Sequence, residues 1–308
     1  MSVVVDNAAF DGSQRVPDTW WRRHQMALTP ALLLLPALLF FGTFVIWPII
    51  SSIDLSFYDW DGIKTPEFIG FGNYVELFHD PVFYTSLANN FWWLVLYMLA
   101  PMFGLAVALY LNQSVFGIRL IKSLFFFPFV ISQVVVGLVF GWFFNANFGL
   151  FNHLLHAFGL HGMALLEHER SATFIVILAG LWPQIAYCMI LYLTGLTAMN
   201  PEVIEAARMD GAKGMKLLWN IIIPQLRPAT FIAVVVSVVG ALRSFDLVAI
   251  MTVGGPVNAS TVLAYYMYQQ TFTAFRYGYG AAIAVVLFLI MDVYIAIFLW
   301  RMLARERG

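Results

Sequence analysis

Long apolar stretches separated by shorter polar segments make up most of this sequence. A helix of about 20 apolar residues is long enough to cross the roughly 30 Å hydrocarbon core of a bilayer. Six stretches meet this criterion, at about residues 27–50, 87–111, 120–144, 172–195, 229–251 and 279–300. The pattern therefore predicts an all-α integral membrane protein with about six transmembrane helices.

Two of the polar segments predict structure outside the lipid. Residues 51–85 are rich in Asp and Glu and contain a single basic residue, Lys64. Residues 145–171 are too polar to cross, and the stretch FGLFNHLLHAFGL within them predicts a short helix in the membrane interface.

The run from Asn200 to Pro224 combines charge, small residues and helix signals between two apolar stretches. Asn200 is a good N-cap, and Pro201 suits the first position of a helix, where its missing N–H is not needed. Gly211 can adopt the left-handed conformation that ends a helix. We expect a short helix, a glycine turn and a second short helix.

Composition agrees with a membrane protein and excludes several classes of function. The chain is 61% hydrophobic and 11% charged, with a mean hydropathy of +0.82, whereas soluble domains have about 45–50% apolar and about 25% charged residues. Cys188 is the only cysteine, which excludes intramolecular disulfides and cysteine-based metal clusters. The net charge of -1 gives no indication of nucleic-acid binding.

Lysine and arginine positions predict the orientation, because positive residues accumulate on the cytoplasmic side. With the N-terminus inside, twelve basic residues fall on the cytoplasmic side and three on the outer side. The twelve are Arg15, Arg22, Arg23, Arg119, Lys122, Arg208, Lys213, Lys216, Arg227, Arg301, Arg305 and Arg307. We expect a cytoplasmic segment at 1–26, a membrane domain at 27–304 and a cytoplasmic tail at 305–308.

A spaced motif lies in the loop between the fourth and fifth spans. It reads Glu205-Ala206-Ala207, three residues, Gly211, nine residues, then Ile221 to Pro224. This resembles the E-A-A loop of binding-protein-dependent ABC importer permeases, with Ile223 in place of the usual leucine. The match to the carbohydrate group, the maltose-type and glycerol-3-phosphate-type permeases, covers about residues 25–305. Supporting features are the N-P-E entry at residues 200–202 and the F-D…T-x-G-G-P run at residues 245–256.

The resemblance implies a type I ABC importer permease fold, with a core at about 83–301 and a coupling loop at 198–228. The residues that it assigns to docking on an ATPase subunit are Glu205, Ala206, Ala207, Gly211 and Pro224. Physically, the alanines leave a bare helix face, Glu205 offers a carboxylate to a partner arginine, and Gly211 permits a sharp reversal.

The implied partners are a second homologous permease subunit, two ATP-binding subunits and an extracytoplasmic binding protein, in a bacterial cytoplasmic membrane. The sequence contains no G-x-x-x-x-G-K-[ST] phosphate loop. We therefore expect ATP and Mg to bind to the partner ATPase, no cofactor on this chain and no enzymatic activity of its own.

Polar residues within spans predict where a substrate binds, because they are costly in lipid. The candidates are Gln184, Tyr187, Ser237, Arg243, Ser244 and Asp246. Their amide, hydroxyl and aromatic groups suit a sugar, and the resemblance places ligand contacts at Tyr187, Ser237 and Ser244. Arg243 and Asp246 stand three residues apart, so they either pair on one helix face or contact the substrate or a gate.

Two other classes of function remain open at this point. An ion-coupled secondary transporter would have broken helices and ion sites near the midplane. A membrane-embedded metalloenzyme would use His153 and His156, with further ligands from the same loop. Neither class explains the cytoplasmic motif. The sugar itself is not specified, and a phosphorylated polyol is compatible with the same residues.

Overall fold

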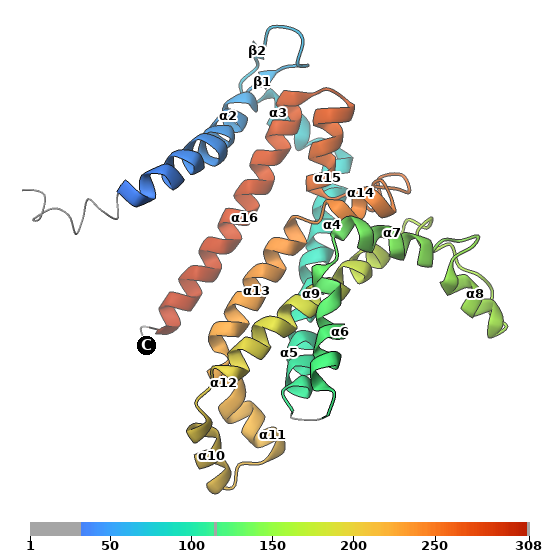
Figure 1. The fold of residues 1–308 in the computed structure, drawn as a ribbon. Coiled ribbons are helices and arrows are strands. Elements are labelled where there is room, and N and C mark those ends of the chain that lie inside the picture. The colour runs from blue at the N-terminus through green and yellow to red at the C-terminus, as the bar shows by residue number, and fades with distance from the viewer. Residues whose placement is uncertain (1–31, 114–115, 307–308) are drawn as a thin grey trace, which may run out of the picture. The chain divides into compact units, whose positions relative to one another are not determined.

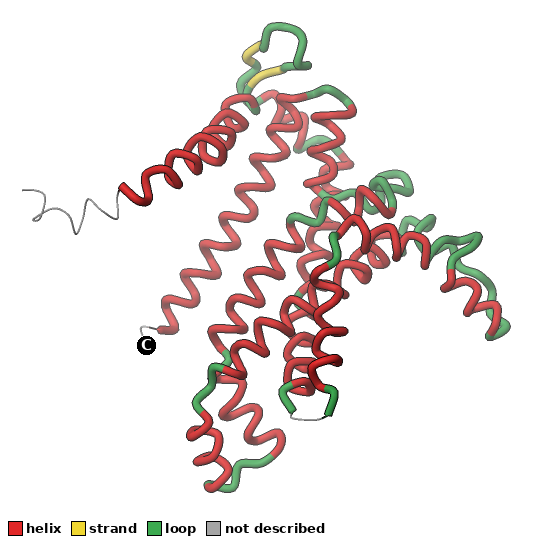
Figure 2. Tube along the Cα trace, viewed as in Figure 1, coloured by secondary structure: helices red, strands yellow, loops and turns green. Residues whose placement is uncertain are grey.

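The computed structural model describes residues 32–113 and 116–306. The predicted cytoplasmic segment 1–26, the first residues of the first span and residues 307–308 of the predicted tail lie outside the described residues. Helix covers most of the described chain, and strand occurs in one short hairpin (Figure 2). The chain divides into two compact units, Met1–Ser51 and Ser52–Gly308.

The first predicted span is one helix, Leu32–Leu55. It contains a π-helical turn, η1 (Gly42–Ile46), followed by α2 (Trp47–Leu55). Pro48 is the second residue after this turn. Because proline lacks an N–H and its ring crowds the carbonyl four residues earlier, a locally wider turn accommodates it.

Three further predicted spans are confirmed as helices of sufficient length. The second consists of α4 (Pro81–Tyr97) and α5 (Leu99–Leu111), which together cover 31 residues. The fourth is α9 (Ala172–Thr197), and the last lies within α16 (Tyr277–Glu306), of which Tyr277–Ile297 meets the criteria for a span.

The predicted third span, 120–144, is two helices instead of one. α6 (Ile118–Val130) and α7 (Gln133–Phe143) meet at a bend of 97°. Ile131 is extended and the Ser132 side chain accepts a bond from the backbone N–H of Val135, at 3.3 Å. Ser132 therefore acts as an N-cap that starts a new helix inside an apolar run.

The predicted fifth span, 229–251, is also broken. α13 (Arg227–Leu242) ends before a three-residue break, and α14 (Asp246–Met251) follows it. At its other end, α13 meets the preceding helical segment, Gly214–Gln225, at 71°. Counting each bent pair as one span, the described residues contain up to six candidate spans.

α9 lies at the centre of the core of the second unit, with α5, α6 and α13 packed against it. α5 approaches α9 closely at Gly104, where an added Cβ would lie 2.6 Å from Cβ of Cys188. Small residues let helix backbones approach closely in membranes, where packing is a main driving force of association. Cys188 is fully buried, as expected for a small apolar side chain within a span.

Short elements cover the two ends of the second unit. One end carries the antiparallel hairpin of β1 (Tyr58–Asp59) and β2 (Glu67–Phe68), followed by α3 (Gly72–Leu77). The opposite end carries the helices of the predicted coupling loop (Figure 1). The predicted interfacial helix is α8 (Leu150–Ala157), and α15 (Leu263–Tyr268) continues into η3 (Gln269–Thr273) before α16.

Buried amides hold the 252–262 loop against the bundle. Asn89 Nδ2 donates to the carbonyls of Ala259 and Thr261, at 2.7 and 2.8 Å. The neighbouring Asn90 Oδ1 accepts from the backbone N–H of Leu263, at 2.9 Å. These bonds join residues about 170 positions apart in the chain, so the two asparagines have a structural role in fixing the loop.

Candidate functional site

The predicted coupling loop has the expected local structure. α10 (Pro201–Met209) begins after Asn200, whose side chain accepts from the N–H of Glu202 at 3.0 Å. Gly211 has φ +82°, and α11 (Gly214–Leu217) follows it. The chain then passes through η2 (Leu218–Ile222) and α12 (Ile223–Gln225), the second of which contains Pro224.

The surface of this loop is exposed and partly apolar. Glu205 and Ala206 are exposed, while Ala207 is buried, so only one of the two alanines belongs to the bare face that the sequence predicts. The Ala207 carbonyl accepts a hydrogen bond from the N–H of Ala212, so the backbone of Ala207 is bonded within the coupling loop itself. Met209 is 88% exposed on the same loop.

A cavity of 430 Å³ lies where the broken helices meet. Its walls come from α4, α7, α9, α13, α14 and the break between the last two. The lining residues are Tyr97, Gln133, Gln184, Tyr187, Val235, Val236, Val239, Gly240, Arg243, Ser244, Phe245, Asp246 and Leu247. Interrupted helices at membrane depth are tolerated where they line such a space.

Each broken element contributes residues near its interruption. Tyr97 is the last residue of α4, Gln133 is the first of α7, and Arg243 follows the end of α13. The break between α4 and α5 lies three residues before Pro101. Because proline has no backbone N–H, Pro101 cannot donate a hydrogen bond to the carbonyl of Tyr97. The breaks thus bring polar side chains of distant segments to one cavity.

Gln184 and Ser237 are joined directly. Gln184 Nε2 donates to Ser237 Oγ at 3.0 Å, and the Ser237 hydroxyl donates to the carbonyl of Ala233 at 2.7 Å. Ser237 is fully buried and does not line the cavity, whereas Gln184 does. The structure therefore corrects the prediction for Ser237, whose hydroxyl lies behind Gln184 and positions its amide.

Tyr187 and Ser244, two of the substrate candidates from the sequence, line the cavity. The ring of Tyr187 stacks on Phe129 of α6, with centroids 4.8 Å apart and planes 18° apart. The Ser244 hydroxyl donates to the carbonyl of Ala241 at 2.8 Å. Stacking fixes the plane of Tyr187, which leaves an oriented aromatic group in the wall.

Arg243 and Asp246 do not form an ion pair on one helix face in this structure, although the sequence gives such a pair as one of two possibilities. Among the described residues, ion pairs join Lys64 to Asp61 and Arg276 to Glu76, and none joins Arg243 to Asp246. The break at 243–245 removes the regular i, i+3 geometry on which such a pair depends. Both side chains are exposed and line the cavity.

Sequence reasoning missed Tyr97 as a substrate candidate, and it gives Gln133 only as a weaker one that interhelical hydrogen bonding explains equally well. Tyr97 is 4% exposed, and Gln133 Oε1 is buried without a hydrogen-bond partner within the described chain. An unpartnered buried oxygen at a cavity wall is an acceptor available to a ligand or to water. Pro101 and Ser132 are the sequence signals for the two breaks that place these side chains.

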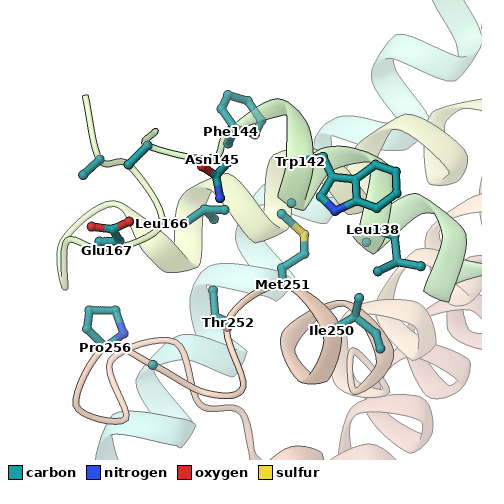
Figure 3. Close-up of a pocket in the computed structure, with 15 residues that line it drawn as sticks. Leu138, Trp142, Phe144, Asn145, Leu166, Glu167, Ile250, Met251, Thr252 and Pro256 are labelled. Atoms are coloured by element: carbon teal, nitrogen blue, oxygen red, sulfur yellow. The ribbon is translucent and has the colours of Figure 1, made fainter. Parts of the chain in front are cut away.

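A second cavity, of 480 Å³, lies at the opposite ends of α7 and α14. Figure 3 shows Trp142 and Leu138 on one side of it and Glu167 and Leu166 on the other. An added Cβ at Gly137 would lie 3.1 Å from Ile250, so α7 and α14 are closely packed. This pair of helices separates the two cavities.

The histidine loop does not form a metal site. His153, His156, His161 and His168 are all exposed. Within the described residues, no three His, Cys, Asp or Glu side chains are arranged to hold a metal ion. Asn152 instead organises the loop through two hydrogen bonds to the backbone of Met163. Its Nδ2 donates to the Met163 carbonyl at 3.1 Å, and its Oδ1 accepts from the Met163 N–H at 2.8 Å.

Comparisons with known proteins agree with this fold. The chain is 38% identical to a probable ABC transporter permease protein, YurN of Bacillus subtilis, over 87% of this chain and 93% of that one. It is 30% identical to the sulfoquinovosyl glycerol transport system permease protein SmoG of Agrobacterium fabrum, over 88% and 89%. It is 31% identical to the sn-glycerol-3-phosphate transport system permease protein UgpA of Yersinia enterocolitica, over 85% and 90%.

A solved structure has the same fold. It is a bacterial ABC transporter involved in the import of the acidic polysaccharide alginate, which matches with a TM-score of 0.79 at 22% identity and covers 93% of this chain and 98% of that one. Residues 100–306 match the family described as binding-protein-dependent transport system inner membrane component. The chain therefore belongs to this family of ABC transporter permease proteins.

Proposed function

We propose that this permease carries a sugar or related polyol across the cytoplasmic membrane as one half of a pore. The observation that carries the proposal is the 430 Å³ cavity at the helix breaks, where amide, phenol and hydroxyl groups meet an oriented aromatic ring. These groups suit a polyhydroxylated solute, and the volume is typical of small-molecule sites. The names of the relatives SmoG and UgpA, which specify sulfoquinovosyl glycerol and sn-glycerol-3-phosphate, support the same class.

In this proposal, other chains supply the driving force for transport. ATP and Mg bind to two partner ATPase subunits, because this sequence has no phosphate loop. Glu205, Ala206 and Gly211 dock on one of them. The exposure of Glu205 and Met209 supports this surface as an interface.

Orientation follows from the basic residues. The coupling loop carries Arg208 on α10, Lys216 on α11 and Lys213 between the two helices. Because positive residues accumulate on the cytoplasmic side, in this proposal the coupling loop and both termini lie in the cytoplasm. The hairpin end then faces outward, toward a solute-binding protein. A second, homologous permease subunit completes the pore.

The connections of the coupling loop suggest how ATP drives transport. α9 leads into α10 through Asn200, and α12 leads into α13 at Arg227. These two long helices carry Gln184, Tyr187 and Ser237. Movement of the docked loop is therefore transmitted to two walls of the cavity, and the cavity opens alternately to the two sides of the membrane.

Purification of the assembled complex tests the proposal. We expect the chain to co-purify with a second permease subunit, an ATPase and a binding protein. In proteoliposomes, ATP hydrolysis should rise when loaded binding protein is added, and uptake should require ATP. Uptake that continues without any ATPase subunit, driven by an ion gradient alone, would contradict it.

A further inference from the structure

Arg243 is a charged side chain of the cavity wall that forms no ion pair within the described residues. It is exposed and lines the cavity wall, and within the described residues no carboxylate lies at ion-pairing distance from its guanidinium. A guanidinium remains protonated in proteins, so this positive charge cannot be removed by proton loss. A charge at membrane depth is a functional feature by default.

The helix break explains why Arg243 and Asp246 do not neutralise each other. Arg243 follows the C-terminus of α13, where a cation is favoured, and Asp246 is in the first turn of α14, where an anion is favoured. Each charge is thus stabilised by the end of its own helix. Both side chains remain available to a solute in the cavity.

Closure of the cavity makes the unpaired cation more costly. Alternating access, which we proposed above and on which this inference rests, requires the cavity to lose contact with bulk water on one side at a time. Because a charge without water or a partner is strongly disfavoured, a counter-charge must be present when the cavity is closed. A solute that carries an anionic group supplies it.

We propose that Arg243 makes this permease selective for acidic sugars or polyols, which carry a carboxylate, phosphate or sulfonate group. The planar guanidinium binds such groups through two parallel hydrogen bonds. Gln184 and Asp246 then face the hydroxyl groups of the solute, and the ring of Tyr187, fixed by Phe129, faces its C–H surface.

The rival explanation is a gate in which Arg243 and Asp246 pair when the cavity closes. The two explanations differ in what removal of Asp246 does. If they form a gate pair, Asp246→Asn should impair the permease as much as Arg243→Gln. If Arg243 binds an acidic solute, Asp246→Asn should preserve or strengthen the binding of that solute, because a nearby negative charge is removed.

The test measures direct binding to the assembled complex in lipid nanodiscs. The probes are two matched pairs of labelled compounds, glucuronate with glucose and glycerol-3-phosphate with glycerol. Binding of each compound is measured by equilibrium dialysis. We expect at least one acidic probe to bind more tightly than its neutral counterpart. Arg243→Gln should weaken binding of that acidic probe roughly 10- to 100-fold, the usual effect of losing a charged hydrogen-bond partner.

Matched variants make the result specific. Arg243→Lys should retain part of the preference because it keeps the charge but not the planar fork. Arg119→Gln removes an exposed arginine at the start of α6 and should change nothing. Binding of the neutral probes should be the same in the wild type and in the Arg243 and Arg119 variants.

Three outcomes would overturn the inference. These are equal binding of acidic and neutral probes, no binding of either acidic probe to the wild-type complex, and equal losses in Arg243→Gln and Asp246→Asn with no further loss in the double variant. The same preparations are assayed for ATP hydrolysis stimulated by the binding protein. Normal stimulation without a charge preference contradicts only the role of Arg243, whereas absent stimulation contradicts the proposed function itself.

Discussion

The side chain of Gln184 on α9 donates a hydrogen bond to the hydroxyl of Ser237 on α13, and the two atoms lie 3.0 Å apart. These are the helices that flank the coupling loop. The bond therefore joins two walls of the cavity at a point between the loop and the helix breaks. It also orients an amide that would otherwise rotate freely toward the cavity.

Ser237→Ala should clearly lower the kcat/KM of uptake while it lowers the melting temperature only slightly. The change leaves the Gln184 amide without its partner, which costs about 1 kcal/mol when water can enter from the cavity. We expect a small fall in melting temperature and a clear loss in kcat/KM for uptake. In a double-mutant cycle with Gln184→Leu, the two effects on uptake should not add, because both changes remove the same contact. Additive losses would show that Ser237 acts independently of Gln184.

Gly211 is required for its backbone conformation and not for its small size. Its φ is +82°, and an added Cβ would meet nothing within 4 Å. Asparagine tolerates this conformation, whereas a β-branched residue does not. We expect Gly211→Asn to support near-normal uptake and Gly211→Val to lose the coupling of ATP hydrolysis to uptake. Equal activity of the two variants would contradict a role for the left-handed turn.

Glu205→Lys should separate ATP hydrolysis from transport. The side chain is exposed, so charge reversal should not disturb folding, and the protein should still insert in the membrane. A docking arginine on the ATPase would instead be repelled, and we expect uptake to fall at least tenfold, because a charge-assisted hydrogen bond contributes about 1.5–3 kcal/mol. Glu202→Lys, an exposed charge reversal in the first turn of the same helix, is the control. Loss of uptake in both variants to the same extent would indicate a general effect of charge.

Gly104→Ala should destabilise the helix bundle. The added methyl group would lie 2.6 Å from Cβ of Cys188 and 2.9 Å from the backbone nitrogen of Met189, so α5 and α9 must separate. Overpacking of this kind costs about 1–3 kcal/mol. Gly141→Ala is the matched control, because an added Cβ there meets nothing within 4 Å. Thermal unfolding in nanodiscs should show a lower melting temperature for the first variant only.

Acid should weaken the contact of the start of α4 with α15 and α16. Asp80 accepts hydrogen bonds from the hydroxyls of Tyr266 and Tyr279 and from the N–H of Val82. Burial alone would raise the pKa of Asp80, but these hydrogen bonds outweigh it and hold the pKa below its ordinary value of 3.8.

Since the folded form has the lower pKa, the stabilising effect is complete well above pH 3.8 and is lost as the pH falls from there through the folded-state value. We expect the melting temperature of the wild type to fall across this range. Asp80→Asn, which keeps a capping oxygen but cannot ionise, should be less stable at neutral pH and should depend less on acid. An equally steep acid dependence in the variant would assign the effect to other carboxyl groups.

Local sequence signals were enough to predict the membrane class, the approximate positions of the spans and the shape of the coupling loop. These features are local: a span needs only a long apolar run, and the loop depends on Asn200, Pro201 and Gly211 acting on their nearest neighbours. The predicted spans at 87–111 and 172–195 accordingly match α4–α5 and α9 within a few residues. The spacing of the loop motif also indicated the family.

Which polar residues of the spans line the cavity, and which contact a neighbouring helix, depends on tertiary packing. Apolar runs flank the short breaks at 131–132 and 243–245 on both sides, so the length of the apolar pattern predicted continuous helices where the chain turns. Whether a polar side chain faces a cavity or a neighbour depends on helices far apart in sequence. For that reason Ser237 is buried behind Gln184, and the break after Leu242 leaves Arg243 unpaired.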